Sequence, residues 1–357
     1  MKRIWFVVTW MVIFTLALSA CGTPAPAMTS TAAGPEELTV MVHDSFSVTE
    51  QLVKDFEAQN NVKVTFLKAG DAGSMINRAV LSKNAPLADV LYGVDNTFLS
   101  RALNEDIFES YDAPALAQIP ASFKVDSQNR VLPVDYGDVC LNYDKAYFSE
   151  KGLVLPESLE ELTKPEYKGL LVMENPATSS PGLAFLLATI AHFGPDEVWN
   201  YWAALRDNDL VVVNDWSTAY SVNFSGSSGK GQQPLVVSYG SSPAVEVVYA
   251  TSPVADAPTA PIVAADMCFR QIEFVGILKG TSHRALAEKF VDFMLSTSFQ
   301  EDMPLQMYVY PVDPAAKLPE VFTKYSEIPV QPVLMPPDII NANRDSWIQK
   351  WTETVLR

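Results

Sequence analysis

The sequence predicts an α/β protein of two domains, on three observations. Its 357 residues exceed what a single hydrophobic core usually holds. Short apolar segments alternate with segments of helical length, as in parallel sheets covered by helices. A long apolar segment at residues 132–143 separates two such series. The composition, 48% hydrophobic and 19% charged, is that of a folded protein.

The first series places polar residues after successive strands. We expect strands at 38–42, 62–67 and 88–93, each followed by a helix, one of them at 74–82. In doubly wound sheets, ligands bind beyond the carboxyl ends of the strands. The polar residues at these ends are Asp44, Ser45, Asp71 and Asp95.

The second series centres on residues 170–194, LLVMENPATSSPGLAFLLATIAHFG. A buried strand is expected at 170–173, and an apolar helix opens at Gly182. The turn between them carries the hydroxyl residues Thr178, Ser179 and Ser180, followed by Pro181. These residues suit helix N-cap positions and would face outward together with free backbone N–H groups. The turn is therefore a candidate anion site, and the alternative is an ordinary capped helix.

The remaining segments continue the alternation. Strands are expected at 132–143, 210–213, 235–239 and 268–278, helices at 283–295 and from about residue 338, and a mobile surface loop at 223–233. The apolar stripe of the last helix indicates packing rather than ligand binding.

The N-terminus predicts export. Lys2 and Arg3 precede the uncharged apolar residues 4–20, which indicate a secretory signal, with a single membrane-spanning helix as the alternative. The motif LSAC, ending at Cys21, resembles the lipobox of bacterial lipoproteins. We expect a signal peptide at 1–20, and at 21–35 a lipidated Cys21 with a flexible tether. The protein would be extracytoplasmic and anchored to the cell membrane by lipid alone.

Charge and cysteine content exclude some classes of function. The formal net charge is −17, or −19 after loss of Lys2 and Arg3, which argues against nucleic acid as a partner. No Cys or His cluster has metal-ligand spacing, so neither a metal nor a cofactor is expected. Cys140 and Cys268 form an even pair in an oxidising compartment, either as a disulfide or as two buried thiols.

Seven stretches, covering nearly the whole mature chain in order, carry a family resemblance. They are LTVMVHDSF, GSMINRAVLSKNAPLADVLYGVDNTFL, VDYGDVCLNYDK, NPATSSPGLAFLL, DWSTAY, VVSYGSSPA and AEKFVDFMLSTSFQEDMPLQMYVYPV. Together they resemble the thiamine-binding branch of the extracytoplasmic solute-binding proteins of ABC importers. The resemblance implies the type II periplasmic-binding-protein fold, in which crossover strands join two α/β lobes around a ligand cleft.

The resemblance also implies a division of the chain. Residues 36–135 and 272–310 would form lobe 1, residues 136–271 lobe 2, and residues 311–357 a C-terminal helical segment assigned to neither lobe. The stretches LPVDYGDVCLNY and CFRQIEFVGIL match the crossovers. If these run side by side in opposite directions, Cys140 and Cys268 lie at matching depths, which favours a disulfide.

A thiamine site would need ring faces, a partner for the fixed positive charge, and an anion site for phosphorylated forms. Trp216, Tyr239 and Tyr308 match family positions for ring contacts, while Asp44, Asp71 and Asp95 could serve the charge or the aminopyrimidine. Thr178, Ser179 and Ser180 would take a hydroxyl or phosphate, and the candidates also include His43, Ser45 and Tyr136. The alternatives are a core position for Trp216, a buried strand-end tyrosine for Tyr239 and a local structural role for His43. The family implies lobe closure, delivery to a membrane permease and a monomer.

Departures from the pattern leave other ligands open. His43, Glu50 and Val245 stand where the family can show aromatic residues, and Tyr308 replaces a tryptophan. The alternatives are a polyamine, another small organic cation or an organophosphonate. Iron is disfavoured because no adjacent Tyr-Tyr pair occurs. An enzyme is also disfavoured, since no nucleophile elbow or metal motif is present and the neighbours His43, Asp44 and Ser45 cannot form a triad.

Overall fold

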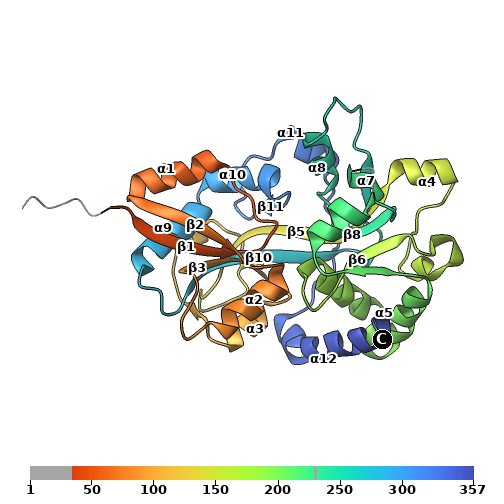
Figure 1. Cartoon of the computed structure of the whole chain (residues 1–357), viewed down its shortest axis with the longest axis horizontal. Coiled ribbons are helices and arrows are strands. Elements are labelled where there is room, and N and C mark those ends of the chain that lie inside the picture. Colours follow the sequence, from red (N-terminus) through yellow and green to blue (C-terminus); the bar gives the residue numbers. More distant parts are fainter. Residues whose placement is uncertain (1–33, 229–230) are drawn as a thin grey trace, which may run out of the picture. The chain divides into compact units, whose positions relative to one another are not determined.

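Two long strands organise the sheet, and shorter strands flank them on both sides. The computed structural model describes residues 34–228 and 231–357, so the expected signal peptide, Cys21 and residues 22–33 lie outside the described residues. The sheet order is β2-β1-β3-β10-β5-β8-β6-β7, and Figure 1 shows β5 and β10 alongside each other. The strands are β1 (Glu36–Val42), β2 (Val62–Lys68), β3 (Val90–Asp95), β4 (Phe108–Glu109), β5 (Leu132–Asp144), β6 (Leu171–Glu174), β7 (Val211–Val213), β8 (Leu235–Tyr239), β9 (Thr259–Ile262), β10 (Phe269–Leu278) and β11 (Tyr310–Pro311).

The pairing is parallel at both ends of the sheet and antiparallel in its middle. β1 pairs in parallel with β2 and β3, and β6 does so with β7 and β8. β10 runs antiparallel to β3 and β5, and β5 runs antiparallel to β8. We call the part with β1–β3 the first side and the part with β6–β8 the second side. Each side is a parallel α/β unit, as the alternation of the sequence predicts, and β5 and β10 cross between them.

The helices follow the strands closely in the first side. They are α1 (Glu50–Asn60), α2 (Ala72–Leu81), α3 (Leu99–Asn104), α9 (Arg284–Met294) and α10 (Thr297–Gln306), with single turns of 3₁₀ helix at Pro114–Ala117 and Ala121–Phe123. Asp71 caps α2, because its carboxylate accepts a hydrogen bond from Ala72 N. The apolar face of α9 packs on the sheet and buries Leu286, Phe290 and Val291, as its helical periodicity predicts.

The second side carries a longer helix and several short ones. They are α4 (Lys145–Lys151), α5 (Ser180–Asp207), α6 (Trp216–Thr218), α7 (Ser225–Ser228), α8 (Pro243–Val248), α11 (Glu320–Tyr325) and α12 (Pro337–Val355), with 3₁₀ turns at Glu160–Thr163 and Pro165–Tyr167 and a π-helical turn at Ala219–Asn223. α5 is interrupted at Gly194. The helix expected to open at Gly182 is therefore followed by a second helical segment across a kink.

One expectation of the sequence is wrong in part. Residues 223–233 were expected to form a mobile surface loop, but residues 225–228 form α7. Phe224 is fully buried and forms a bridge with Gln233. Burial of this aromatic ring outweighs the Gly and Ser content that favours a loop.

The C-terminal segment packs on the second side and also reaches the first. α11 contacts α8, and α12 contacts both α5 and α3. The stripe of α12 is packing, as predicted, because Ile340, Trp347, Trp351 and Val355 are buried. Residues 35–357 group as one compact unit, so the expected lobe boundaries stay a prediction. None of the described helices is long and apolar enough to cross a membrane.

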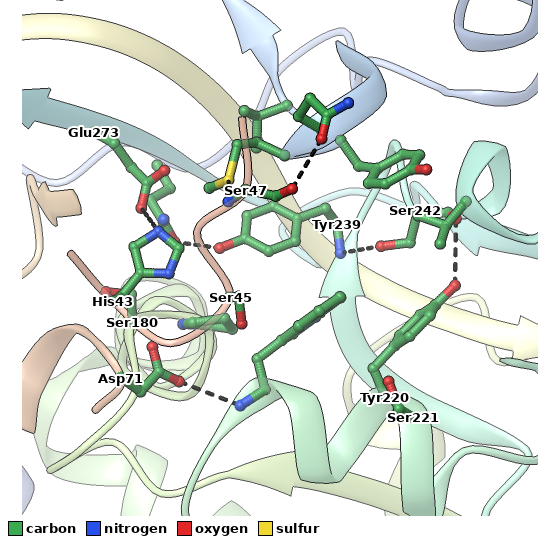
Figure 2. A pocket seen from close by; sticks show the side chains of 18 of the residues that line it. His43, Ser45, Ser47, Asp71, Ser180, Tyr220, Ser221, Tyr239, Ser242 and Glu273 are labelled. Carbon is green, nitrogen blue, oxygen red and sulfur yellow. Dashed lines mark hydrogen bonds and ion pairs between the residues drawn. The ribbon is translucent and has the colours of Figure 1, made fainter. Parts of the chain in front are cut away.

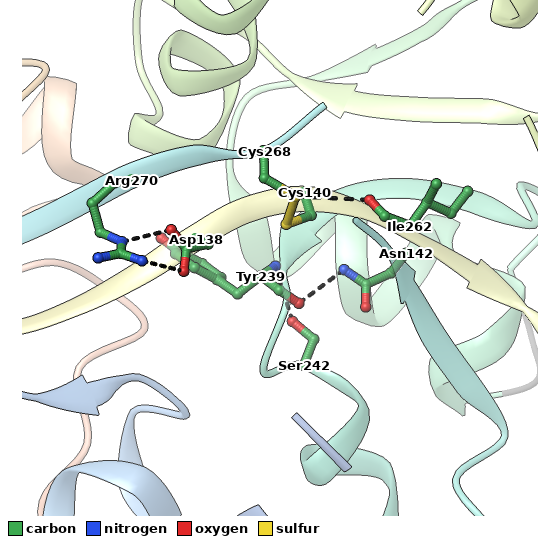
Figure 3. The surroundings of a disulfide bond; sticks show 8 residues. All are labelled: Asp138, Cys140, Asn142, Tyr239, Ser242, Ile262, Cys268 and Arg270. Carbon is green, nitrogen blue, oxygen red and sulfur yellow. Dashed lines mark hydrogen bonds and ion pairs between the residues drawn. A yellow bond between two sulfur atoms is a disulfide. The ribbon is translucent and has the colours of Figure 1, made fainter. Parts of the chain in front are cut away.

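A disulfide fastens β5 to the start of β10. Cys140 and Cys268 are bonded, and Arg270 forms a bidentate ion pair with Asp138 on the same two strands (Figure 3). Asn142 Nδ2 donates to the carbonyl of Tyr239, which fixes the end of β8 against β5. Gly137 on β5 leaves room for the Tyr239 ring, since a Cβ there would lie 2.8 Å from its Cδ1 atom. The crossing strands therefore position Tyr239.

Candidate functional site

A cavity of about 420 Å³ opens where the strands of both sides end. His43 and Ser45 follow β1, Asp71 follows β2, and Ser180 begins α5. Trp216 begins α6, and Tyr239 ends β8. All six line the cavity, and Figure 2 shows His43, Asp71 and Tyr239 from different elements around it. This is the place where α/β sheets of this kind bind ligands.

Three carboxylates line the cavity. They are Asp71, Glu246 and Glu273, and no Lys or Arg is present among the described lining residues. Burial raises the pKa of Asp71 to about 6, against the lowering effect of hydrogen bonds from Ser179 and the backbone. Burial also raises the pKa of Glu246 to about 7. The described lining of the cavity is therefore acidic and holds neither Lys nor Arg to balance it.

His43 does not supply that positive charge. Burial and the nearby Lys68 lower the pKa of His43 to about 4, so the imidazole is neutral at neutral pH. Its Nε2 atom lies 3.7 Å from Glu273 Oε1. Lys68 itself donates to the carbonyl of Asp44 and does not line the cavity.

Aromatic rings form much of the remaining wall. Trp216 stacks nearly parallel on Tyr220, with ring centroids 5.0 Å apart, and its Nε1 donates to Ser238 Oγ. Tyr239 donates its hydroxyl to Gln271 Oε1. Tyr308 lies 6.0 Å from Tyr249, measured between ring centroids. These contacts hold flat apolar surfaces against the cavity, and the polar ends of Trp216 and Tyr239 stay hydrogen-bonded.

Tyr308 adopts an uncommon backbone conformation. Its φ of 56° is in the left-handed region, which bulky residues rarely occupy. Tyr308 N donates to the carbonyl of Met303, and Ser241 Oγ donates to the carbonyl of Tyr308. Such conformations gather at binding sites, where the surrounding structure holds them in place.

The two sides touch along one edge of the cavity. Asp71 Oδ2 accepts a hydrogen bond from Trp216 N, and Ser45 Oγ lies 3.2 Å from Ser217 Oγ. Gly73 N donates to the carbonyl of Thr178, which joins α2 to the turn before α5. These direct contacts describe a closed arrangement of the two sides.

Comparison with known proteins agrees with this geometry. A family model described as bacterial extracellular solute-binding protein matches residues 85–327. The chain belongs to the bacterial extracellular solute-binding proteins. This is a family of transport components and not of enzymes, and its members act outside the cytoplasm with a small-molecule ligand and an ABC permease.

Within this family, the chain is similar to several proteins named as thiamine-binding. The chain is 30% identical over 331 residues to the thiamine-binding periplasmic protein of Salmonella typhimurium (strain LT2), covering 90% of this chain and 94% of the relative. It is 30% identical over 352 residues to the thiamine-binding periplasmic protein of Brucella abortus biovar 1, covering 97% and 98%. A solved structure, a periplasmic thiamin binding protein, superposes with a TM-score of 0.79 at 28% identity, covering 90% and 97%. The expected two-lobed type II periplasmic-binding-protein fold is confirmed.

Seven of the predicted site residues of this solute-binding protein line the cavity. They are His43, Ser45, Asp71, Ser180, Trp216, Tyr239 and Tyr308. Their roles toward a ligand stay predictions. What the sequence predicts correctly is their convergence, because the carboxyl ends of parallel strands meet at one edge of a sheet.

Five predicted residues do not line the cavity. Asp44 is exposed, and its carboxylate accepts from Gly70 N at the turn after β2. Tyr136 stacks against Phe123 and Tyr310. The others are Asp95, Thr178 and Ser179. Their expected place in the wall of the site is corrected, because they lie outside the described lining of the cavity, and any contact with a ligand stays a prediction.

The turn before α5 is the clearest correction. Its three hydroxyls were expected to face outward together, but Ser180 donates to Asp95 and Thr178 donates to the carbonyl of Asn214. Ser179 occupies the N-cap position and is fully buried. Because Asp71 and Asp95 already face this helix N-terminus, it offers little to a phosphate.

Sequence reasoning missed Tyr220, Glu246, Tyr249, Gln271 and Glu273, which also line the cavity. Glu273 carried a usable signal, since an acid inside an apolar strand is rarely buried without a purpose. Glu246 lies on α8, which begins with Pro243 after Ser242, and no strand-end pattern points to it.

Proposed function

We propose that this solute-binding protein captures thiamine in the cavity between its two sides and delivers it to an ABC permease. The observation that carries the proposal is the pairing of aromatic walls with carboxylates, with neither Lys nor Arg among the described lining residues. Thiamine is a planar organic cation, so a ring face and a carboxylate are the partners it needs.

Trp216 is the proposed ring partner. Tyr220 covers one face of the indole, and the Nε1 hydrogen bond to Ser238 fixes its orientation. A cation against the other face of a tryptophan gains roughly 0.5 to 2 kcal/mol. Two relatives named thiamine-binding periplasmic protein, matched over nearly the full chain, support this ligand.

Unphosphorylated thiamine is the form that we propose. A phosphate ester would bring negative charge toward Asp71, Glu246 and Glu273, and neither Lys nor Arg stands among the lining residues that the structure describes. Like charges in a partly buried site repel strongly because water screens them little. Thiamine phosphate and thiamine diphosphate should therefore bind more weakly than thiamine.

A polyamine is the second candidate. Glu273 lies on β10 and Glu246 on α8, so the cavity carries acidic groups from separate elements. A chain with several ammonium groups could contact both. The aromatic walls favour thiamine, because a flexible polyamine gains less from flat ring surfaces than a planar ligand does.

We also propose that the chain acts as a monomer and is held at the membrane through a lipid on Cys21. The lipobox-like motif LSAC and the Pro, Ser and Thr content of residues 22–34 support this attachment. A tether of this kind leaves the folded part free to meet a permease.

Calorimetric titration tests the proposed ligand. The purified protein is unfolded and refolded to remove carried-over ligand, and is then titrated with thiamine, its phosphate and diphosphate, and spermidine. We expect submicromolar binding of thiamine and weaker binding of both phosphorylated forms. Binding of spermidine without thiamine would replace the proposed ligand by a polyamine.

A further inference from the structure

Three carboxylates stand in one row across three neighbouring strands. Glu273 on β10 is paired in register with Asp95 on β3 and with Asp135 on β5. Residues directly opposite each other in antiparallel strands point to the same face of the sheet. The three carboxylates therefore share one face, and Glu273, the middle member, lines the cavity.

The three carboxylates of the row are buried. Among the described residues, no Lys or Arg forms an ion pair that would balance their negative charge. The exposed fractions are 0% for Asp95 and Asp135 and 6% for Glu273. Within residues 34–228 and 231–357, none of the three forms an ion pair with Lys or Arg; Arg270, on the same strand as Glu273, is paired with Asp138 instead. The groups facing the row are otherwise neutral or acidic.

Those facing groups come from every neighbouring element. Tyr92 on β3 donates its hydroxyl to Asp135 at 2.5 Å and lies 3.4 Å from Glu273 Oε2. Ser180 and Thr97 donate to Asp95. Asp71, the N-cap of α2, and Tyr239, at the end of β8, interact electrostatically with Glu273. His43 approaches Glu273 from the end of β1.

His43 gives a second, independent indication of a ligand. Its side chain is more than nine-tenths buried and lines the cavity, yet its Nε2 atom makes no hydrogen bond within the described residues. Figure 2 shows the ring directed at Glu273, 3.7 Å away. A buried polar atom without a partner is costly unless something else occupies the site.

We propose that Glu273 pairs with the positive charge of the ligand, and that a proton on the carboxylate row takes its place while the cavity is empty. This inference rests on the proposed capture of a cation. Three buried carboxylates within one row cannot all be ionised without a counter-charge. When the cation enters, one proton leaves for solvent, so the charge of the row and its partner is unchanged.

The raised pKa values of the carboxyl groups in the row are consistent with this exchange of a proton for a cation. Burial, with the neighbouring Asp135, raises the pKa of Glu273 well above its usual range, and burial raises the pKa of Asp135 to about 6. A raised carboxyl pKa means that the empty site holds its proton up to a higher pH. Below that pKa the cation must displace the proton, so affinity should rise with pH by up to about tenfold per pH unit.

Calorimetry in buffers of different ionisation enthalpy measures the proton directly. Thiamine is titrated at pH 6.5 into the refolded protein in each buffer, and the slope of observed enthalpy against buffer enthalpy counts protons. We expect release of about one proton per thiamine from the row. Binding of thiamine without proton release overturns the inference and leaves the proposed function standing. Absence of thiamine binding means that the proposed function itself fails.

Two isosteric variants locate the proton. Glu273→Gln should abolish most of the release and lower the affinity at pH 8 by at least about tenfold, since a neutral amide cannot pair with the cation. Glu246→Gln removes the other lining glutamate and should keep the release. If release persists in Glu273→Gln and disappears in Glu246→Gln, the proton belongs to α8 and the inference is wrong. Thermal unfolding of each variant checks folding.

Discussion

Trp216 combines packing and recognition in one side chain. It is half-buried, stacks on Tyr220 and donates its indole N–H to Ser238, while its backbone N–H reaches Asp71 on the opposite side. The sequence left open whether this residue belongs to the core or to the site. The structure places it at the boundary, where one ring face packs and the residue still lines the cavity.

Replacing this tryptophan should weaken binding more than it weakens the fold. We expect Trp216→Ala to reduce thiamine affinity by at least tenfold, about 1.4 kcal/mol, because the ring face is lost. Trp216→Phe is the matched control and should lose less, since it keeps a ring. Equal affinity in Trp216→Ala and the unchanged protein, measured by calorimetry, would remove this residue from the site.

Some residues of the site could be predicted because each follows a strand in the sequence. Residues whose place in the site depends on contacts between distant strands could not. The strand-end rule indicates Asp44, Ser45, Asp71 and Asp95, and of these Ser45 and Asp71 line the cavity. Asp44 does not line the cavity, because it lies in the turn after β1, where its carboxylate accepts a hydrogen bond from Gly70 N. The row of Asp95, Glu273 and Asp135 depends on the register of three distant strands, which no local pattern encodes.

The contact between α2 and the turn before α5 determines how closely the first and second sides approach each other. Gly73, in the first turn of α2, donates its N–H to the carbonyl of Thr178. A Cβ on Gly73 would lie 2.8 Å from the carbonyl oxygen of Ala177 and 2.8 Å from Phe98 Cζ. Because backbone cannot yield as a flexible side chain can, a glycine here permits the two sides to approach closely.

A methyl group at this position should hinder closure without weakening the helix. Alanine favours a helix over glycine by roughly 0.5 to 1 kcal/mol, so Gly73→Ala should not destabilise α2 itself. We expect several-fold weaker thiamine binding, with thermal stability of the ligand-free protein retained. Arg78→Ala, at an exposed position of the same helix, is the control and should bind normally. Unchanged affinity in Gly73→Ala would mean that this contact does not limit closure.

Elements were predicted best where apolar periodicity was strong. The strands β1, β5, β8 and β10 match their expected ranges to within two residues at each end, α9 does so as a helix, and α12 begins within two residues of its expected start. The loop expected at 223–233 was wrong in part because Phe224 finds a buried place that local composition does not reveal. The hydroxyls of the turn before α5 do not face outward together as expected, because Ser180 and Thr178 bind the protein's own groups, and an anion site there stays a prediction.

At the scale of the whole molecule, β5 and β10 connect the fold with its function. They carry the disulfide Cys140–Cys268, the Arg270–Asp138 pair, and two of the three carboxylates of the row. Of these two strands, β10 also lines the cavity, through Gln271 and Glu273. The family resemblance anticipated these crossings, whereas the accumulation of buried acid on them became visible only through the pairing of the strands.

A crystal structure of the protein with thiamine, grown at pH 8, tests the central claim most directly. We predict that the thiazolium lies against the ring of Trp216, within about 6 Å of its centroid, with its positive charge facing the Glu273 carboxylate. The contacts of Asp71 with Trp216 and of Gly73 with Thr178 should be retained around it. Thiamine bound outside this cavity, or bound within it with its charge turned away from the carboxylates, would contradict the account.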